Sequence, residues 1–122
     1  MTPSQAAGRT PRELSELHDV YDFLDEVRLR PGMFLRRPSP LQDLQSILYG
    51  YRVATEVHGA PSMKIFEHFG PFSEWLWPRL DMQHPSALGW AVEIERAAEA
   101  AGTPAVELFF ELLDEFRAEP VR

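Results

Sequence analysis

The chain has 122 residues, of which 44% are apolar and 25% are charged, a composition typical of a globular protein with one hydrophobic core. It contains no cysteine, which excludes disulfides, thiolate metal sites and a cysteine nucleophile. The formal charge of −7 is uneven: residues 1–61 carry seven bases and eight acids, and residues 62–122 carry five bases and eleven acids. This acidic excess argues against nucleic-acid binding, which needs Lys and Arg to replace phosphate counterions. It suits a basic protein partner.

No apolar run reaches the roughly 20 residues that a membrane-spanning helix needs. The first nine residues are small and polar, without the apolar stretch of a secretion signal. We therefore expect a disordered tail over residues 1–9, a single helical domain over residues 10–119, no membrane association and a cytoplasmic location.

Two long helices are predicted in the first half. Thr10-Pro11 is a helix start, and the apolar residues that follow at helical spacing predict a helix that ends near Arg30, before Pro31-Gly32. Ser39-Pro40 repeats the start signal, and Gly59 is expected to end that helix.

Three further helices are predicted in the second half. Gly70-Pro71 begins a short one, which Pro78 should distort or end. Ser86 is a plausible cap for the next, and Thr103-Pro104 begins the last. Because no segment alternates with a period of two, the fold class predicted is all-α, a compact single-domain bundle of about five helices.

Four arginines lie within ten residues around the end of the first predicted helix: Arg28, Arg30, Arg36 and Arg37. Guanidinium groups match the geometry of phosphates and carboxylates, so the four form a candidate anion-binding site. Alternatively, they stabilise a helix C-terminus and pair with acids elsewhere in the chain.

An acidic strip follows the last predicted helix at intervals of four, through Glu107, Glu111, Glu115 and Glu119, with Asp114 beside it. Like charges at this spacing repel one another. The sequence supplies no base within the strip before Arg117. The strip is therefore either a solvated face or a docking surface for a basic partner.

Trp75 and Trp77 are two residues apart, so they point in different directions from one helix. Trp75 shares the inward stripe with Phe72, which leaves Trp77 as the predicted exposed anchor for a partner.

The sequence predicts no metal site and no cofactor. His18, His58, His68 and His84 are scattered and match no ligand spacing. No nucleophile elbow, phosphate-binding loop or dinucleotide-binding motif is present, so catalysis is unsupported.

A resemblance covers most of the chain. The segments 30–35, 50–51, 66–77, 89–90 and 109–116 follow the pattern RPGM(Y/F)L, GY, FxxF…W, GW and FFxLLDEF. This pattern resembles a family of small bacterial proteins, some of which are similar to immunity proteins of toxin systems. Residues 24–35 also resemble the VRKRPGMYIG signature of the ATPase domain of DNA gyrase B. The catalytic Glu and Mg²⁺-binding Asn of that domain are missing from the following helix, so the shorter match is interpreted as coincidental.

Three functions remain open. The first is a non-enzymatic protein-binding module, such as an immunity protein that neutralises a basic toxin. The second is a regulator that binds a small anionic ligand through the four arginines. The third is an enzyme or accessory protein of a biosynthetic cluster with a site between helices.

Overall fold

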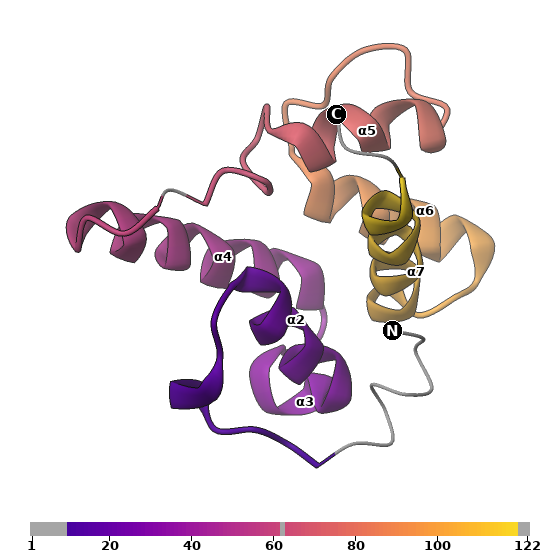
Figure 1. Cartoon of the computed structure of the whole chain (residues 1–122). Coiled ribbons are helices and arrows are strands. Elements are labelled where there is room, and N and C mark those ends of the chain that lie inside the picture. Colours follow the sequence, from indigo (N-terminus) through magenta and orange to yellow (C-terminus); the bar gives the residue numbers. More distant parts are fainter. Residues whose placement is uncertain (1–9, 62, 120–122) are drawn as a thin grey trace. The chain divides into compact units, whose positions relative to one another are not determined.

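The computed structural model describes residues 10–61 and 63–119, which form six α-helices and one short 3₁₀-helix and include no strand (Figure 1). The all-α prediction is confirmed. Contacts within the chain divide it into two units, which meet in sequence at Arg36 and Arg37. The tail predicted over residues 1–9 lies outside the described residues, and the single domain over residues 10–119 stays a prediction. Throughout the described ranges, no helix combines the length and hydrophobicity that a membrane span needs.

The first unit contains a 3₁₀-helix η1 (Leu14–Glu16) and two α-helices, α2 (Val20–Leu29) and α3 (Pro31–Phe34). The prediction that the first helix ends near Arg30 is confirmed. Pro31 does not end the helical structure, however, because it takes the first position of the single turn α3.

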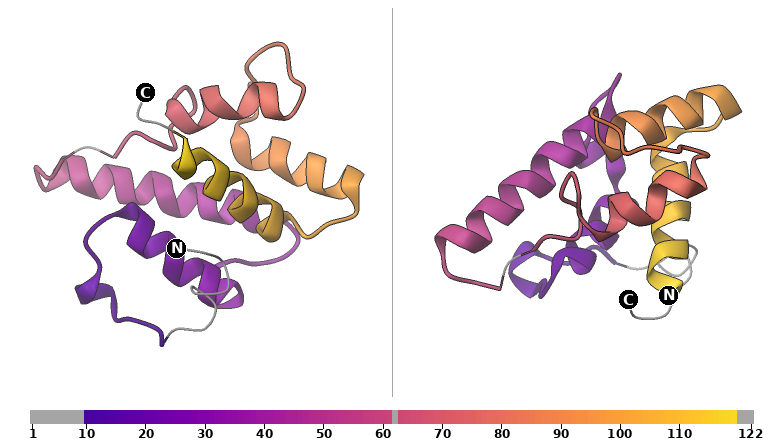
Figure 2. Two further views of the ribbon diagram at one scale, coloured as in Figure 1. Left: turned by 45° about the vertical axis from the view of Figure 1, so that its right-hand side comes forward. Right: turned by 90° about the horizontal axis from the view of Figure 1, so that it is seen from above.

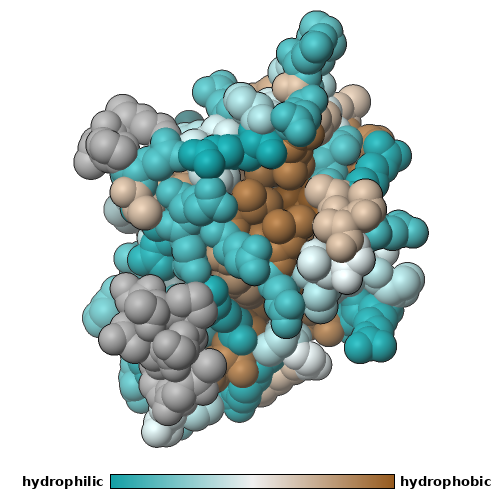
Figure 3. Space-filling model, turned by 90° about the vertical axis from the view of Figure 1, so that its right-hand side faces the viewer, coloured by the Kyte–Doolittle hydropathy of each residue, from teal (hydrophilic) through white to brown (hydrophobic). Residues whose placement is uncertain are grey.

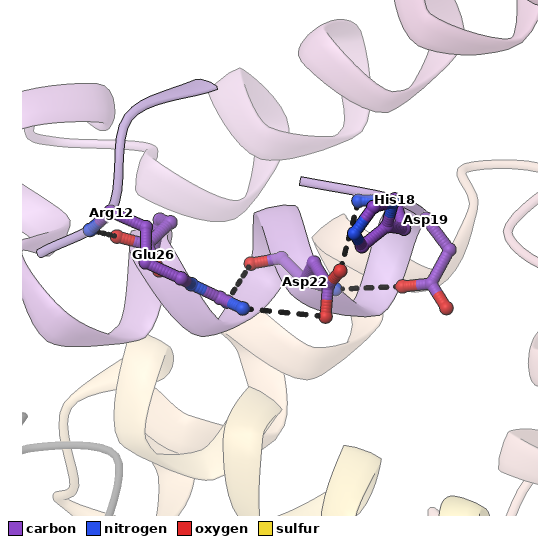
Figure 4. A network of polar contacts seen from close by, with 5 residues as sticks. All are labelled: Arg12, His18, Asp19, Asp22 and Glu26. Atoms are coloured by element: carbon purple, nitrogen blue, oxygen red, sulfur yellow. Dashed lines mark hydrogen bonds and ion pairs between the residues drawn. The ribbon is translucent and has the colours of Figure 1, made fainter. Parts of the chain in front are cut away.

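The predicted helix start at Thr10 is wrong, because α2 begins ten residues later. The carboxylate of Asp19 accepts a hydrogen bond from the backbone N–H of Asp22 at 2.9 Å, and the Asp22 carboxylate accepts one from the N–H of His18 at 2.9 Å (Figure 4). The first bond satisfies a backbone N–H in the first turn of α2, and the second satisfies a backbone N–H just before the helix. This local cap fixes the first residue of α2 at Val20.

An ion pair between the buried carboxylate of Glu26 and the partly exposed guanidinium of Arg12 holds the segment before η1 against α2. Glu26 is 1% exposed, and its two carboxylate oxygens accept hydrogen bonds from the backbone N–H and the Nε of Arg12, both at 2.9 Å (Figure 4). Arg12 also donates to the carbonyl oxygen of Asp22 at 3.2 Å. The hydrogen bond with Glu26 is the main cause that raises the pKa of Arg12, so this guanidinium stays protonated.

The second unit contains four helices: α4 (Pro40–Val57), α5 (Pro71–Arg79), α6 (Trp90–Ala101) and α7 (Ala105–Ala118). Helix α4 packs against α6 and α7, and α7 also packs against α6 and α5 (Figure 2). The helix starts predicted at Pro40 and Pro71 are confirmed, with a proline in the first turn of each helix. Gly59 and Gly102 follow their helices with φ of 69° and 73°, the left-handed conformation expected after a helix end.

Aromatic side chains fill the centre of the second unit. Trp90 and Phe109 are stacked with ring centroids 5.2 Å apart, and Phe72 forms T-shaped pairs with Trp90, Phe109 and Phe116 at centroid distances of 5.4–5.9 Å. The indole N–H of Trp90 donates to the carbonyl oxygen of Phe66 at 3.1 Å. This bond ties the start of α6 to the segment that precedes α5.

Helix α6 begins later than its predicted cap, Ser86. Its N-cap is Gly89, with φ of 94° and ψ of 170°, a conformation that is nearly restricted to glycine. The Ser86 hydroxyl instead donates to the Glu93 carboxylate at 2.6 Å and accepts from the N–H of Leu88 at 2.9 Å. Ser86 therefore orders the approach to α6 rather than capping it.

Candidate binding groove along helix α4

Within the second unit, the buried residues of α4 all lie in the first half of the helix. Its buried residues are Leu41, Leu44 and Leu48, and the second half extends past α5, α6 and α7 (Figures 1 and 2). On that second half Tyr49 and Val57 are 64% and 73% exposed, with Val53 at 38%. Residues four apart lie on one helix face. Helix α4 therefore carries an exposed apolar stripe, formed by Tyr49, Val53 and Val57.

Apolar surface is not confined to the interior. Figure 3 shows the side of the molecule on which α6 lies in Figure 1, away from the second half of α4, and there a band of hydrophobic residues runs between hydrophilic ones. Across the described chain, seven large hydrophobic side chains are exposed. Two of them belong to the first unit, and five belong to the second: Tyr49, Val53, Val57, Phe69 and Leu88.

A hollow of about 380 Å³ lies between α4 and the segment that leads to α5. Its apolar lining includes Leu48, Met63 and Phe66, which are buried, and its rim includes Tyr49 and Phe69, of which Phe69 is 70% exposed. Small-molecule sites usually have this form, a mostly apolar hollow of some hundreds of Å³ with a few polar groups.

Two further hollows continue along the same helix. One, of about 400 Å³, shares Gln45 and Tyr49 with the first hollow and has Leu88 and Val92 on its other wall. Another, of about 410 Å³, shares Val92 with the second hollow and adds charged side chains of α6. Because neighbouring hollows share lining residues, we treat the three as one α4 groove. It has an apolar end at Phe69 and a charged end at α6.

Side chains of α4 and of the segment before α5 lie near Gly89, at the start of α6. A Cβ atom at this position would lie 3.1 Å from the side-chain nitrogen of Gln45 and 3.6 Å from Nδ1 of His68. The glycine therefore lets the Gln45 amide approach the backbone at the start of α6 closely, whereas His68 lies at an ordinary contact distance. Both side chains line the first hollow, where they add polar groups to an apolar wall.

Arg52 also lines the first hollow, but its charge is already balanced. Its guanidinium forms ion pairs with Glu56, at 3.2 Å, and with Glu67. Two carboxylates beside one guanidinium weaken its attraction for an anionic ligand. The first hollow is therefore better suited to an apolar group than to a phosphate or a carboxylate.

Glu95 of α6 caps the N-terminus of α4. Its carboxylate accepts hydrogen bonds from the backbone N–H groups of Leu41 and Gln42, at 2.9 and 3.3 Å, and from the Gln42 side chain at 2.7 Å. Ser39, the start signal in the sequence, makes no side-chain cap. Sequence reasoning missed Glu95 because its partners lie 53 and 54 residues away.

The four candidate anion-binding arginines are divided between the two units. Arg28 lies in the last turn of α2, Arg30 follows that helix, and Arg36 is the last residue of the first unit. Arg37 belongs to the second unit. Arg30, Arg36 and Arg37 are exposed, and Arg28 is half-buried. An anion site that combines all four stays a prediction.

The acidic strip lies on α7 as predicted, but a base from another helix relieves it. Arg79 of α5 forms ion pairs with Glu115 at 2.9 Å and with Glu119 at 2.7 Å. The expectation that Arg117 is the first base to serve the strip is therefore wrong. Glu107 and Glu111 are exposed, and Asp114 is half-buried. Whether these acids bind a partner stays a prediction.

The predicted exposure of the two tryptophans is reversed. Trp77 is only 6% exposed because it belongs to the buried face of α5, with Phe72, Ser73 and Leu76. Trp75 is half-buried, donates a hydrogen bond to the Glu119 carboxylate, and has the guanidinium of Arg79 4.7 Å from its ring centre. Both indoles therefore have packing roles within the second unit.

The four histidines belong to separate segments of the chain. His18, His58 and His84 are exposed, and His68 lines the groove. Within residues 10–61 and 63–119, no group of three ligand-type side chains is placed to hold a metal ion.

Comparisons of the chain with protein-family models, with curated proteins and with solved structures find no match.

Proposed function

We propose that this chain is a non-enzymatic binding protein that docks another protein along α4. One observation carries the proposal. In the described part of the second unit, every exposed large hydrophobic side chain lies on the apolar stripe of α4 or lines the groove beside it: Tyr49, Val53, Val57, Phe69 and Leu88. Exposed apolar residues scattered singly are normal, whereas their concentration on one surface marks an interaction site.

Tyr49 and Phe69 are the best candidates for the centre of such an interface. Both line the first hollow and both are more than 60% exposed, so a partner would remove a large apolar area from water. Full burial of a side chain of this size contributes about 1.5–3 kcal/mol. A few residues of this kind usually supply most of the binding free energy in a protein interface.

A basic partner fits the charge of the chain. Residues 62–122 carry five bases and eleven acids, which attracts proteins of opposite charge. One such partner would be a basic toxin that this chain neutralises. The support for a toxin as the partner is the sequence resemblance to immunity-like proteins.

The proposal is tested by photo-crosslinking in cells that make the protein. We expect a photoreactive phenylalanine analogue at Phe69 to capture a discrete partner protein. The matched control is the same analogue at Glu107, an exposed position on the acidic strip. Capture at position 107 without capture at position 69 would show that the partner uses the strip on α7 and not the groove.

The captured partner, once purified, allows a quantitative test. We expect Phe69→Ala and Tyr49→Ala each to weaken its binding by about tenfold or more. The double variant Glu107→Ala with Glu111→Ala should have a smaller effect, since both acids lie outside the groove lining. Unchanged affinity in Phe69→Ala would contradict the proposal.

A further inference from the structure

The surface chemistry of the groove identifies the kind of segment that fills it. We infer that the occupant is an amphipathic α-helix of the partner, with basic residues beside its apolar stripe. This inference rests on the proposed function and adds the chemical class of the partner.

The spacing of the stripe on α4 matches helix packing. Tyr49, Val53 and Val57 follow one another at intervals of four and span about 12 Å along the helix axis. Rows of side chains at this spacing form the ridges that fit between the ridges of a second helix. The hollows that meet at Tyr49 leave room for the side chains of that second helix.

The polar groups of the groove also favour a helix over an extended segment. A strand that binds a surface needs partners for its own backbone N–H and C=O groups, usually an open sheet edge. The described residues contain no strand, and the main chain of α4 is occupied by its own hydrogen bonds. A helix arrives with its backbone bonds already made, so it requires only side-chain contacts from the groove.

The charges along the groove favour a basic helix. Its lining carries three carboxylates, from Glu67, Glu95 and Glu99, and two guanidiniums, from Arg52 and Arg96. Glu56, 46% exposed, adds a fourth carboxylate next to Arg52. Opposite charge on the partner would speed association and fix the orientation of the helix.

The same charges disfavour a second copy of this chain as the occupant. Each copy carries a formal charge of −7, so two grooves that face one another bring like charges together. The protein alone should therefore be monomeric in light scattering. A dimer that dissociates on Val53→Asp would overturn the inference, because it would identify the occupant as a second copy.

Three synthetic peptides test the inference directly. The parent peptide carries leucines at helical spacing with flanking lysines, the second has glutamates in place of the lysines, and the third has a proline at its centre, which breaks the helix. Fluorescence anisotropy measures the binding of each peptide to the full chain. We expect the lysine peptide to bind and the other two to bind about tenfold more weakly or worse.

Variants of the protein locate the site. Phe69→Ala and Val53→Asp should each weaken binding of the lysine peptide by about tenfold. The matched control for the added charge is Ala100→Asp, at an exposed position of α6 outside the groove lining, which should leave binding unchanged.

The outcomes separate the two proposals. Equal binding of the proline peptide, equal binding of the glutamate peptide, or no binding of the lysine peptide would each overturn the helical, basic occupant. A cross-linked partner at position 69 would still support the proposed function in those cases. Failure of both the peptides and the cross-linking would overturn both proposals.

Discussion

In the first unit, the buried carboxylate of Glu26 depends on a residue that is distant in the sequence. A carboxylate that is 1% exposed loses nearly all of its hydration and needs hydrogen bonds in exchange. Arg12 supplies two of these, one from the backbone and one from the guanidinium, across 14 residues of sequence. The segment before η1 therefore helps to stabilise α2.

We expect Arg12→Ala to lower the Tm of the protein, because it removes a charged partner from a buried carboxylate. Differential scanning calorimetry measures the change. Arg96→Ala is the matched control, since Arg96 is 64% exposed and only 3.7 Å from Glu93 in an i, i+3 pair. A Tm change in Arg12→Ala no larger than that of the control would show that the ion pair does not stabilise the fold.

Two glycines should respond to alanine in opposite directions. Gly89→Ala is expected to destabilise the protein by about 1–3 kcal/mol, because its φ of 94° suits only glycine and the added Cβ would approach Gln45. Gly50 lies inside α4 with no atom within 4 Å of an added Cβ, so Gly50→Ala should stabilise by about 0.5–1 kcal/mol. Urea unfolding of both variants tests the pair, and a loss of stability in Gly50→Ala would contradict it.

At the scale of the element, α4 depends on α6 for its first turn. The carboxylate of Glu95 accepts bonds from two backbone N–H groups that have no partner within α4. A negative group at this end also interacts favourably with the helix dipole. The helix begins at Pro40 for a local reason, the fixed φ of proline, but its first turn is completed by a residue of another helix.

We expect Glu95→Ala to destabilise the protein by about 1 kcal/mol, the usual cost of a lost N-terminal cap. Glu99→Ala, one turn further along α6 on an exposed side chain, should change stability much less. Chemical denaturation of both variants measures the difference. Equal losses of stability in the two variants would show that the hydrogen bonds from α4 to Glu95 contribute nothing beyond the effect of one negative charge on α6.

The helices that the sequence predicted well are those with local signals at both ends. Pro40, Gly59 and Pro71 act through their own backbone conformations, so their effects can be predicted without knowledge of the fold. The start of α2 was not predicted, because Thr10-Pro11 also has the local pattern of a helix start and the prediction relied on it. In the structure, Asp19 caps α2, and Arg12 lies in the segment before η1, where it pairs with Glu26 of α2.

The candidate site was less predictable than the fold. The groove exists because the second half of α4 is left uncovered, and no local pattern in the sequence distinguishes Val53 and Val57 from core residues. The assignment of Trp77 failed for the same reason. Two tryptophans two residues apart point in different directions, and the sequence alone does not show which direction faces the other helices.

At the scale of the whole molecule, the charge of −7 determines how a basic partner approaches. Long-range attraction between opposite charges raises the association rate, and salt screens it over a distance of about 8–10 Å at physiological ionic strength. The apolar contacts at Tyr49 and Phe69 depend much less on salt.

We therefore expect added salt to slow association with the partner and to change dissociation little. Surface plasmon resonance at several NaCl concentrations separates the two rates. Phe69→Ala should have the opposite signature, with faster dissociation and a nearly unchanged association rate. A partner whose association rate does not depend on salt would contradict the basic character that we propose for it.

The hydrogen bond from the Trp90 indole to the Phe66 carbonyl has a further consequence for recognition. With the Glu95 carboxylate, it connects α6 to both of the other segments that border the groove. These two contacts hold the segments of the groove together in the free protein, so a partner helix should lose more conformational freedom on binding than the groove does. A groove of this kind selects its partner by shape, so a helix with a bulky side chain at a position that does not match the hollows should bind much more weakly.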